Sequence, residues 1–134
     1  MENPDGKFLV LENLTKDCLK PSILDLKMGT RMYSDFASET KASSQRRKCS
    51  KTTSSSLGVR FCGSYKYQAE ESDYKRTDKY VGRTKDIVTL TSLLRDFFST
   101  SETGKIHLDV IHNVIEQLQK IKNIILELGH SIKH

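Results

Sequence analysis

Apolar residues recur at helical spacing through the last third of the chain. Residues 84–99 place large aliphatic and aromatic side chains on one wide stripe, and a second stripe runs from Leu108 to Leu128. Both stripes have the three-to-four-residue spacing of an amphipathic helix. They are wider than the a/d seam of a coiled coil, so we expect two helices within residues 84–129 that pack together into a core.

The sequence before these helices has the two-residue period of a β-strand. In residues 57–67 we expect one face to hold Leu57, Val59, Phe61, Tyr65 and Tyr67, and the other to hold Arg60, Cys62, Ser64 and Lys66. Gly63 interrupts the apolar face, which predicts a bulge or a close backbone approach. Residues 50–56 form a polar link, and residues 69–83 predict a hairpin or excursion. Together with the other predicted elements, these strands and helices indicate a mixed α and β domain, of the α+β class.

Two further strands are predicted nearer the N-terminus. Residues 7–14 are apolar on both faces, so we expect a buried strand there. Residues 21–31 begin with proline and then alternate. Their two faces are expected to be Ile23, Asp25 and Lys27, and, packed inward, Leu24, Leu26 and Met28. Such a strand would hold a carboxylate and an ammonium side by side next to a phosphorylated ligand.

Positive charge is concentrated in the middle of the sequence. The 134 residues carry a formal net charge of +5, and the stretch from Thr40 to Ala69 contains seven basic residues and no acidic one. The remainder of the chain is slightly acidic. A local positive field indicates a polyanionic partner at one place on the molecule.

Residues 35–49 predict a surface helix that overlaps the start of this basic stretch, with Ser34 or Asp35 as the N-cap. Helical spacing places four polar side chains on one face: Lys41, Ser44, Gln45 and Lys48. A solvated charged face is the common explanation of such a pattern. The absence of nearby acids favours an anion-binding face instead, and both interpretations remain open at this point.

Several kinds of site are disfavoured by the residues that the sequence lacks. It has no Walker A loop, GxGxxG or HExxH motif, and no Ser-His-Asp pattern. Three cysteines without CxxC spacing disfavour a disulfide framework and a zinc site, and they fit a reducing compartment, cytoplasmic or nuclear. The four histidines are better explained as solvated helix residues than as metal ligands. Neither a secretory signal nor a membrane-spanning run is expected.

The strand predicted at residues 21–31 contains a recognisable motif. Pro21, Asp25, Lys27 and Gly29 resemble the PxxxDxKxG signature of the inositol polyphosphate kinases. The surrounding sequence is most similar to inositol hexakisphosphate kinases, through Asp25–Arg31, Ala37–Glu39, Lys41-Ala42, Gln45, Arg47–Cys49, Thr53-Ser54, Leu57–Arg60, Cys62-Gly63, Lys79-Tyr80 and Gly82-Arg83. The resemblance runs in order along nearly the whole chain.

The resemblance implies a bilobal fold that is similar to protein kinases and related to ATP-grasp proteins. Residues 1–134 would be a partial inositol polyphosphate kinase domain, containing only the hinge and part of the C-terminal lobe. Its parts would be residues 7–31 as the hinge strand and the PxxxDxKxG strand, 35–49 as the inositol-phosphate-binding helix, 57–67 as a core strand and 84–129 as two core helices.

The resemblance also implies roles for single residues. Backbone near Glu12 and Leu14 would meet the adenine of ATP. Asp25 would bind the ribose hydroxyls, and Lys27 would contact the inositol phosphate and the phosphoryl group in transfer, so these two are the expected catalytic residues. The inositol-phosphate-binding residues would be Lys27, Lys41, Ser44, Gln45 and Lys48. Ser44 departs from relatives that have an amide or a longer polar group.

Two parts of such a kinase lie outside the resemblance. These are the N-lobe lysine that contacts the ATP phosphates and the aspartate that coordinates Mg²⁺. We therefore expect ATP and Mg²⁺ as cofactors of a complete enzyme, no metal ligand within this chain, and little activity from the chain alone. It would be a fragment of a longer kinase or a truncated product, and poorly stable by itself.

The sequence leaves alternative functions open. The first is ATP-dependent phosphoryl transfer to inositol hexakisphosphate, giving a diphosphoinositol phosphate, with an inositol polyphosphate multikinase as the neighbouring possibility. The second is a non-catalytic inositol-phosphate-binding module. A nucleic-acid partner is disfavoured, because Tyr65 and Tyr67 lie on the opposite face of their strand from Lys66. No membrane partner is expected.

Overall fold

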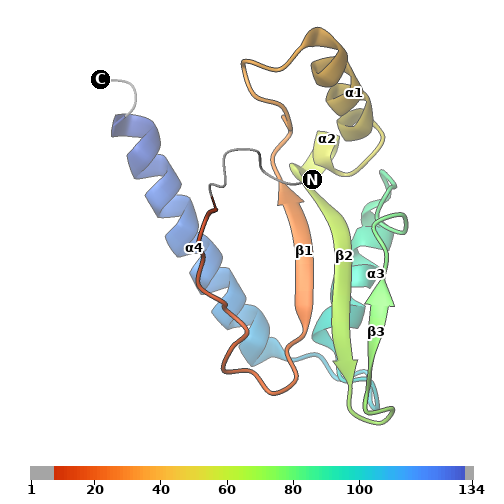
Figure 1. Cartoon of the computed structure of the whole chain (residues 1–134). Helices are drawn as coiled ribbons and strands as arrows, with labels where there is room; N and C mark the ends of the chain where they lie inside the picture. Colours follow the sequence, from red (N-terminus) through yellow and green to blue (C-terminus); the bar gives the residue numbers. More distant parts are fainter. Residues whose placement is uncertain (1–7, 132–134) are drawn as a thin grey trace.

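The computed structural model describes residues 8–131, and it has a small antiparallel sheet with helices around it (Figure 1). The elements in chain order are β1 (Ile23–Met28), α1 (Glu39–Ser50), α2 (Ser54–Leu57), β2 (Val59–Gln68), β3 (Asp73–Thr77), α3 (Ile87–Phe98) and α4 (Leu108–Ser131). The predicted α+β class is confirmed. In the described part of the chain, no helix has the length and apolarity needed to cross a membrane.

β2 is the central strand of the sheet, whose order is β1-β2-β3. β3 follows β2 through a short turn, so the hairpin expected in residues 69–83 is confirmed. α2 follows directly after α1, which puts a helical turn into the expected polar link. The C-cap of α2 is Gly58, whose φ of 66° lies in the left-handed region that favours glycine.

A bulge in β2 changes the faces that the sequence predicted for this strand. Asp25 pairs with Gly63 and Leu26 pairs with Phe61, so Cys62 is an extra residue opposite β1. One extra residue reverses the in-and-out alternation beyond it. Val59 and Phe61 therefore share a face with Ser64 and Lys66, while Arg60 and Cys62 share the other face with Tyr65 and Tyr67. The predicted assignment of faces was wrong for the half of the strand beyond Gly63, although Gly63 did indicate the bulge.

The face that carries Phe61 and Lys66 is covered by α3. Lys66 is only 7% exposed, and its ammonium donates a hydrogen bond to the backbone carbonyl of Asp96 in the last turn of α3. The Asp96 carboxylate also pairs with Lys75 of β3 at 3.1 Å. A buried lysine and the hydroxyl of the C-cap residue Ser99 thus both donate to this carbonyl in the last turn of the helix.

β1 shows most of the alternation predicted for it. Leu24 and Leu26 are half-buried, and Asp25 and Lys27 are exposed on the other face. Met28 is 67% exposed, so the expectation that it packs with the leucines was wrong. It is the last residue of the strand, where the chain turns away at Gly29.

α1 begins four residues later than predicted. Ser38, not Ser34 or Asp35, is the N-cap, and its side chain accepts from the backbone N–H of Lys41. Ser34 instead closes a turn in which its carbonyl accepts from the N–H of Ala37, at 3.1 Å. The Asp35 carboxylate pairs with Arg31.

The strand predicted for residues 7–14 is absent from the described residues of that range. Residues 8–13 form no regular secondary structure, and a turn follows at 14–17. The apolar side chains there are exposed, with Phe8 at 84%. A strand needs a neighbouring strand for its hydrogen bonds. Among residues 8–131, β1 pairs only with β2, so the segment that precedes β1 is not part of the sheet.

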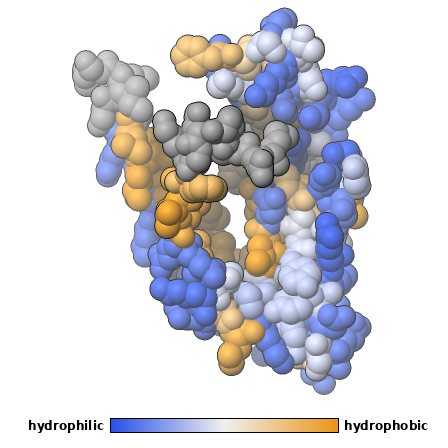
Figure 2. Space-filling model, viewed as in Figure 1, coloured by the Kyte–Doolittle hydropathy of each residue, from blue (hydrophilic) through white to orange (hydrophobic). Residues whose placement is uncertain are grey.

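The two predicted C-terminal helices are present, but they do not form a common core. α3 packs on β2, whereas α4 makes no substantial contact with any other described helix or strand. The helix also continues to Ser131, past the end of the predicted range 84–129. The apolar stripe of α4 is open to solvent, with Leu118 at 48% exposed. Figure 2 shows hydrophobic surface between α4 and the sheet.

Candidate functional site

A cavity of about 610 Å³ lies between the sheet, α1 and the loop that follows β3. Seven basic side chains line it: Lys27, Arg47, Lys48, Lys51, Arg60, Lys79 and Arg83. The other lining residues are Asp25, Gln45, Thr52, Phe61 and Cys62. We call this cavity the basic cleft.

The sheet supplies a carboxylate and two cations to the basic cleft. Asp25 and Lys27 share a face of β1 because they are two residues apart. Lys27 is paired with Arg60 across the β1–β2 ladder, and directly paired residues share a face. Arg60 and Cys62 lie just before the reversal in alternation, so Arg60 points to the same side as Asp25.

α1 supplies the opposite side of the basic cleft. Gln45 and Lys48 lie on the helical face predicted from their spacing, and Arg47 and Lys51 extend that side toward α2. The helix is held by its buried residue Cys49, whose thiol donates to the carbonyl of Thr30 at 2.9 Å. This contact fixes the end of α1 next to the end of β1.

The cations of the basic cleft are not neutralised by protein carboxylates. Among residues 8–131, the ion pairs within 4.0 Å use other basic residues, namely Lys16, Arg31, Arg46, Lys75 and Arg76. Asp25 is the one carboxylate in the lining. Unpaired like charges around a cavity focus a positive field there, which attracts a polyanion.

Two arginines outside the cleft, Arg31 and Arg46, are paired with carboxylates and fix the chain. The Arg46 guanidinium donates hydrogen bonds to the Tyr33 hydroxyl oxygen and to the Glu39 carboxylate. These two bonds, the one to Tyr33 first, raise the pKa of Arg46 above its ordinary value. Asp35 raises the pKa of Arg31 through a hydrogen bond and its charge. Both guanidinium groups also lie over the Tyr33 ring, with Arg31 at 4.8 Å and Arg46 at 5.5 Å from its centroid. These contacts join α1 to the segment that follows β1.

The structure brings four of the predicted site residues together. Asp25, Lys27, Gln45 and Lys48 line the basic cleft, while the other two α1 residues, Lys41 and Ser44, are not part of its lining. Glu12 and Leu14 lie in the exposed N-terminal segment, away from this lining, where Glu12 pairs with Lys16 at 3.6 Å. The roles given to these residues by resemblance stay predictions.

Five basic residues of the cleft were missed from the sequence: Arg47, Lys51, Arg60, Lys79 and Arg83. The first three belong to the acid-free stretch, so its composition could have indicated them. Lys79 and Arg83 come from a mixed-charge segment, and only the fold brings them to the cleft.

The basic cleft fits a phosphorylated ligand better than it fits a metal ion. A Mg²⁺ site needs several oxygen ligands, and Asp25 is the cleft's one carboxylate. No group of three or more His, Cys, Asp or Glu suited to a metal occurs in the described part of the chain. Glu12 and Leu14, near which the adenine contacts are predicted, do not line either of the cavities that Asp25 lines.

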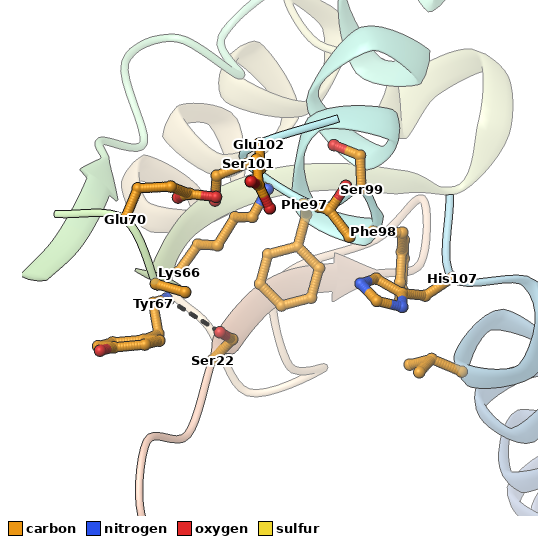
Figure 3. A pocket seen from close by; sticks show the side chains of 13 residues that line it. Ser22, Lys66, Tyr67, Glu70, Phe97, Phe98, Ser99, Ser101, Glu102 and His107 are labelled. Atoms are coloured by element: carbon orange, nitrogen blue, oxygen red, sulfur yellow. Dashed lines mark hydrogen bonds between the residues drawn. The ribbon is translucent and has the colours of Figure 1, made fainter. Parts of the chain in front are cut away.

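A second cavity, of about 410 Å³, lies where the end of β2 meets the C-terminal end of α3. Figure 3 shows the Phe97 ring projecting into it, with His107 across from Tyr67 and the backbone N–H of Tyr67 bonded to Ser22. Its lysine, Lys66, is already bonded to α3, and Glu70 and Glu102 add negative charge. This cavity is therefore poorly suited to a polyanion.

Comparison with known proteins finds relatives among the inositol phosphate kinases. The sequence model of the family described as "Inositol polyphosphate kinase" matches residues 8–131. Inositol hexakisphosphate kinase 3 of Mus musculus is 35% identical over 124 residues, which cover 92% of this chain and 31% of that protein. Inositol hexakisphosphate kinase 2 of Homo sapiens is 39% identical over 119 residues, covering 89% of this chain and 28% of that protein.

Solved structures of inositol phosphate multikinases are similar as well. One aligns with a TM-score of 0.66 and 32% identity, over 74% of this chain and 46% of that one. Another, the S. cerevisiae enzyme in complex with ADP and Mn²⁺, aligns with a TM-score of 0.56 and 31% identity, over 64% of this chain and 40% of that one. Compared with the two inositol hexakisphosphate kinases given above, the chain spans about 30% of their length. From the match over residues 8–131, the chain belongs to the inositol polyphosphate kinase family.

Proposed function

We propose that this chain supplies the inositol-phosphate-binding surface of an inositol hexakisphosphate kinase. In that reaction a phosphate oxygen of inositol hexakisphosphate attacks the γ-phosphorus of ATP, the bond to the bridging oxygen breaks, and ADP leaves with a diphosphoinositol phosphate as the other product. The observation that carries the proposal is the basic cleft, where seven cations without carboxylate partners surround one cavity.

The chemistry of phosphoryl transfer fits such a cleft. The reaction needs positioning and charge stabilisation more than covalent help from the protein. Flexible lysine side chains can surround a ring of phosphates without one fixed bidentate geometry. Each charge-assisted hydrogen bond contributes roughly 1.5–3 kcal/mol, so three or four of them could support micromolar binding after the costs of association.

Asp25 lies where two cavities meet, which supports a role at the junction of two ligands. Beside the basic cleft is a hollow of about 330 Å³, lined by residues that include Arg76 and Tyr65. Asp25, Cys62 and Lys79 line both cavities. We assign Asp25 to the ribose of ATP on the side of this hollow, and Lys27 to the inositol phosphate and the transferred phosphoryl group.

The complete reaction requires groups beyond those described. Mg²⁺ and the adenine contacts expected near Glu12 and Leu14 belong to the proposal for the complete kinase. The chain alone should bind the inositol phosphate and transfer little. Cys18, Cys49 and Cys62 are free thiols, and with them we place the protein in the cytoplasm or nucleus.

Isothermal titration calorimetry with inositol hexakisphosphate tests the proposal. The unsubstituted chain is compared with Lys27→Ala/Lys48→Ala, which removes two cations from the cleft. The matched control is Lys105→Ala/Lys120→Ala, which removes two exposed lysines elsewhere. We expect the cleft variant to lose affinity by tenfold or more, and the control to change little. Equal loss in both variants, or no binding by the unsubstituted chain, contradicts the proposal.

The multikinase alternative is supported by the two structural neighbours, which are both multikinases. A competition experiment separates the two substrates. If an inositol trisphosphate displaces inositol hexakisphosphate at equal or lower concentration, the multikinase assignment is favoured.

A further inference from the structure

The cavity of about 410 Å³ at the end of β2 has no role in the function proposed above. Because aromatic rings form one of its walls, we call it the aromatic cavity. We propose that it is a second ligand site, which takes a small organic cation composed of an ammonium group and an aromatic ring. It shares no lining residue with the basic cleft, so this inference does not depend on the proposed function.

Four parts of the chain meet at the aromatic cavity. Ser22 precedes β1, Tyr67 lies near the end of β2, Phe98 ends α3, and His107 precedes α4. The backbone N–H of Tyr67 donates to the Ser22 hydroxyl oxygen at 3.0 Å, and the backbone N–H of His107 donates to the Phe98 carbonyl at 2.9 Å. These bonds hold the walls together around a volume within the range of about 300–1,000 Å³ that is usual for small-molecule sites.

Phe97 makes the centre of the apolar wall, and its ring projects into the cavity (Figure 3). This ring meets the Phe98 ring edge-on, with 5.2 Å between the centroids and 89° between the planes, so its orientation is restrained. Both phenylalanines are only half-buried, which leaves apolar surface for a ligand. Aromatic pairs favour offset-stacked or edge-to-face arrangements. The wall therefore favours a ligand that has an aromatic ring.

The charged groups of the lining favour a cation. Glu70 and Glu102 are exposed, and neither carboxylate has an ion-pair partner within 4.0 Å among residues 8–131. Lys66 also belongs to the lining, but its ammonium already donates to a carbonyl of α3, and Lys20 lies outside the lining. A ligand in the aromatic cavity therefore meets two carboxylates that no ion pair neutralises.

The C-terminal end of α3 adds to this preference. Partial negative charge gathers at the end of a helix, where the last carbonyls lack intrahelical partners. Lys66 already uses this property, since its ammonium binds the backbone carbonyl of Asp96. The ammonium of a ligand would face the same helix end and the two glutamates, while its ring would contact Phe97. A carboxylate on the same ring would be repelled.

An NMR titration of the full chain with three small molecules tests the site. The probe is 2-phenylethylammonium, and the matched probes are 3-phenylpropionate, which has the opposite charge, and n-butylammonium, which has no ring. We expect saturable shifts in the amide signals of the lining residues at up to about 10 mM of the first probe, and binding weaker by about fivefold or more for the other two. No saturable shift with 2-phenylethylammonium, or equal binding of 3-phenylpropionate, overturns the inference.

A charge variant identifies the groups that hold the cation. Glu70→Gln/Glu102→Gln should weaken binding of 2-phenylethylammonium by about fivefold or more. The control Asp17→Asn/Glu116→Gln removes the same charges outside the lining and should change the affinity by less than about twofold. All four side chains are exposed, so the fold should stay intact, as circular dichroism can verify. Equal affinities for the two variants would show that the cavity carboxylates do not bind the ammonium.

Phe97→Leu tests the apolar wall, because it keeps an apolar side chain and removes the ring. It should weaken binding of 2-phenylethylammonium several-fold and leave the weaker binding of n-butylammonium unchanged. An equal change for both cations would contradict recognition of the ligand ring by Phe97.

The two sites of the chain can be separated with the cleft variant. Lys27→Ala/Lys48→Ala should bind 2-phenylethylammonium as tightly as the unsubstituted chain does, since neither lysine lines the aromatic cavity. A loss as large as that of Glu70→Gln/Glu102→Gln would place the cation elsewhere and overturn the inference.

Discussion

The basic cleft and α4 differ in how far each depends on contacts between distant parts of the chain. The cleft is assembled from β1, α1, β2 and the loop after β3, which meet through sheet pairing and buried contacts. α4 is a single regular helix whose apolar stripe contacts almost nothing. A strong helical period is thus enough to form a helix, but it does not say what the helix will pack against. The cleft shows the converse, because weak local patterns become a site once the sheet aligns them.

The two regions also expose opposite kinds of surface. The cleft presents cations without carboxylate partners, whereas α4 presents aliphatic side chains without apolar partners. Each needs something else to complete it, a polyanion in one case and apolar surface in the other. Experiments that act on one region and spare the other can therefore test whether they are independent.

Core truncation should separate the two regions most strongly. Phe61 is 2% exposed, so Phe61→Ala is expected to cost about 3–5 kcal/mol, enough to unfold a domain of marginal stability. Leu118→Ala in α4 should change the free energy of unfolding by much less, because that side chain is about half exposed. Urea denaturation followed by circular dichroism measures both. Similar costs would mean that α4 is packed in solution.

The apolar surface of α4 should be detectable with a neutral hydrophobic dye. Leu118→Lys/Ile125→Lys is expected to reduce Nile red fluorescence several-fold and to change the free energy of unfolding by no more than about 0.5 kcal/mol. The control Gln119→Lys/Asn123→Lys adds the same charge on the polar side of the helix. If both variants reduce fluorescence equally, the dye is responding to charge and not to the apolar stripe.

Salt should affect the two regions differently. Raising the ionic strength from about 0.1 M to about 1 M shortens the Debye length from about 10 Å to about 3 Å. Binding of inositol hexakisphosphate at the cleft should weaken several-fold by calorimetry. Nile red fluorescence at α4 should stay constant or rise. A parallel decline in both signals would contradict the assignment of charge to one region and apolar contact to the other.

The smallest expected effect is the pH dependence of α3, the helix that does pack on the sheet. A hydrogen bond from the Thr89 side chain, and then the backbone N–H groups of Val88 and Thr89, lower the pKa of the N-cap Asp86 below its ordinary value of 3.8. The folded pKa is thus below the unfolded one. The carboxylate therefore stabilises the helix at higher pH, and this contribution is lost as the pH falls through the lowered pKa.

Asp86→Asn isolates this titration, since asparagine can cap a helix but does not titrate in this range. Acid unfolding followed by circular dichroism should show a larger loss of stability in the unsubstituted chain than in the variant. Identical acid profiles would remove the role of the cap.

The existence and type of α1, β1, β2, α3 and α4 could be predicted from periodicity, and the family from the motif at Pro21–Gly29. Spacing also placed Gln45 and Lys48 together on α1, and the structure brings that face to Asp25 and Lys27. These are local properties, since they depend on residues within one turn or one strand.

The errors arose where distant parts of the chain decide the outcome. Residues 7–14 have the composition of a buried strand, but no described strand pairs with the residues of that segment that the structure describes. The α4 stripe predicted a core with α3, but the two helices lie apart. Lys79 and Arg83 reach the cleft only because the β2–β3 hairpin returns the chain to it and Gly82 permits close packing.

The bulge at Cys62 has a consequence for recombination among relatives. This one inserted residue shifts the alternation of side chains between the two faces of the sheet. As a result, odd-numbered residues before the bulge and even-numbered residues after it face α3. A chimera that joins the two halves from different relatives will fold correctly only if the residue count between Phe61 and Ser64 is preserved. A single deletion there would turn the Lys66 ammonium toward solvent and direct Tyr65 and Tyr67 at α3, although no other residue had been changed.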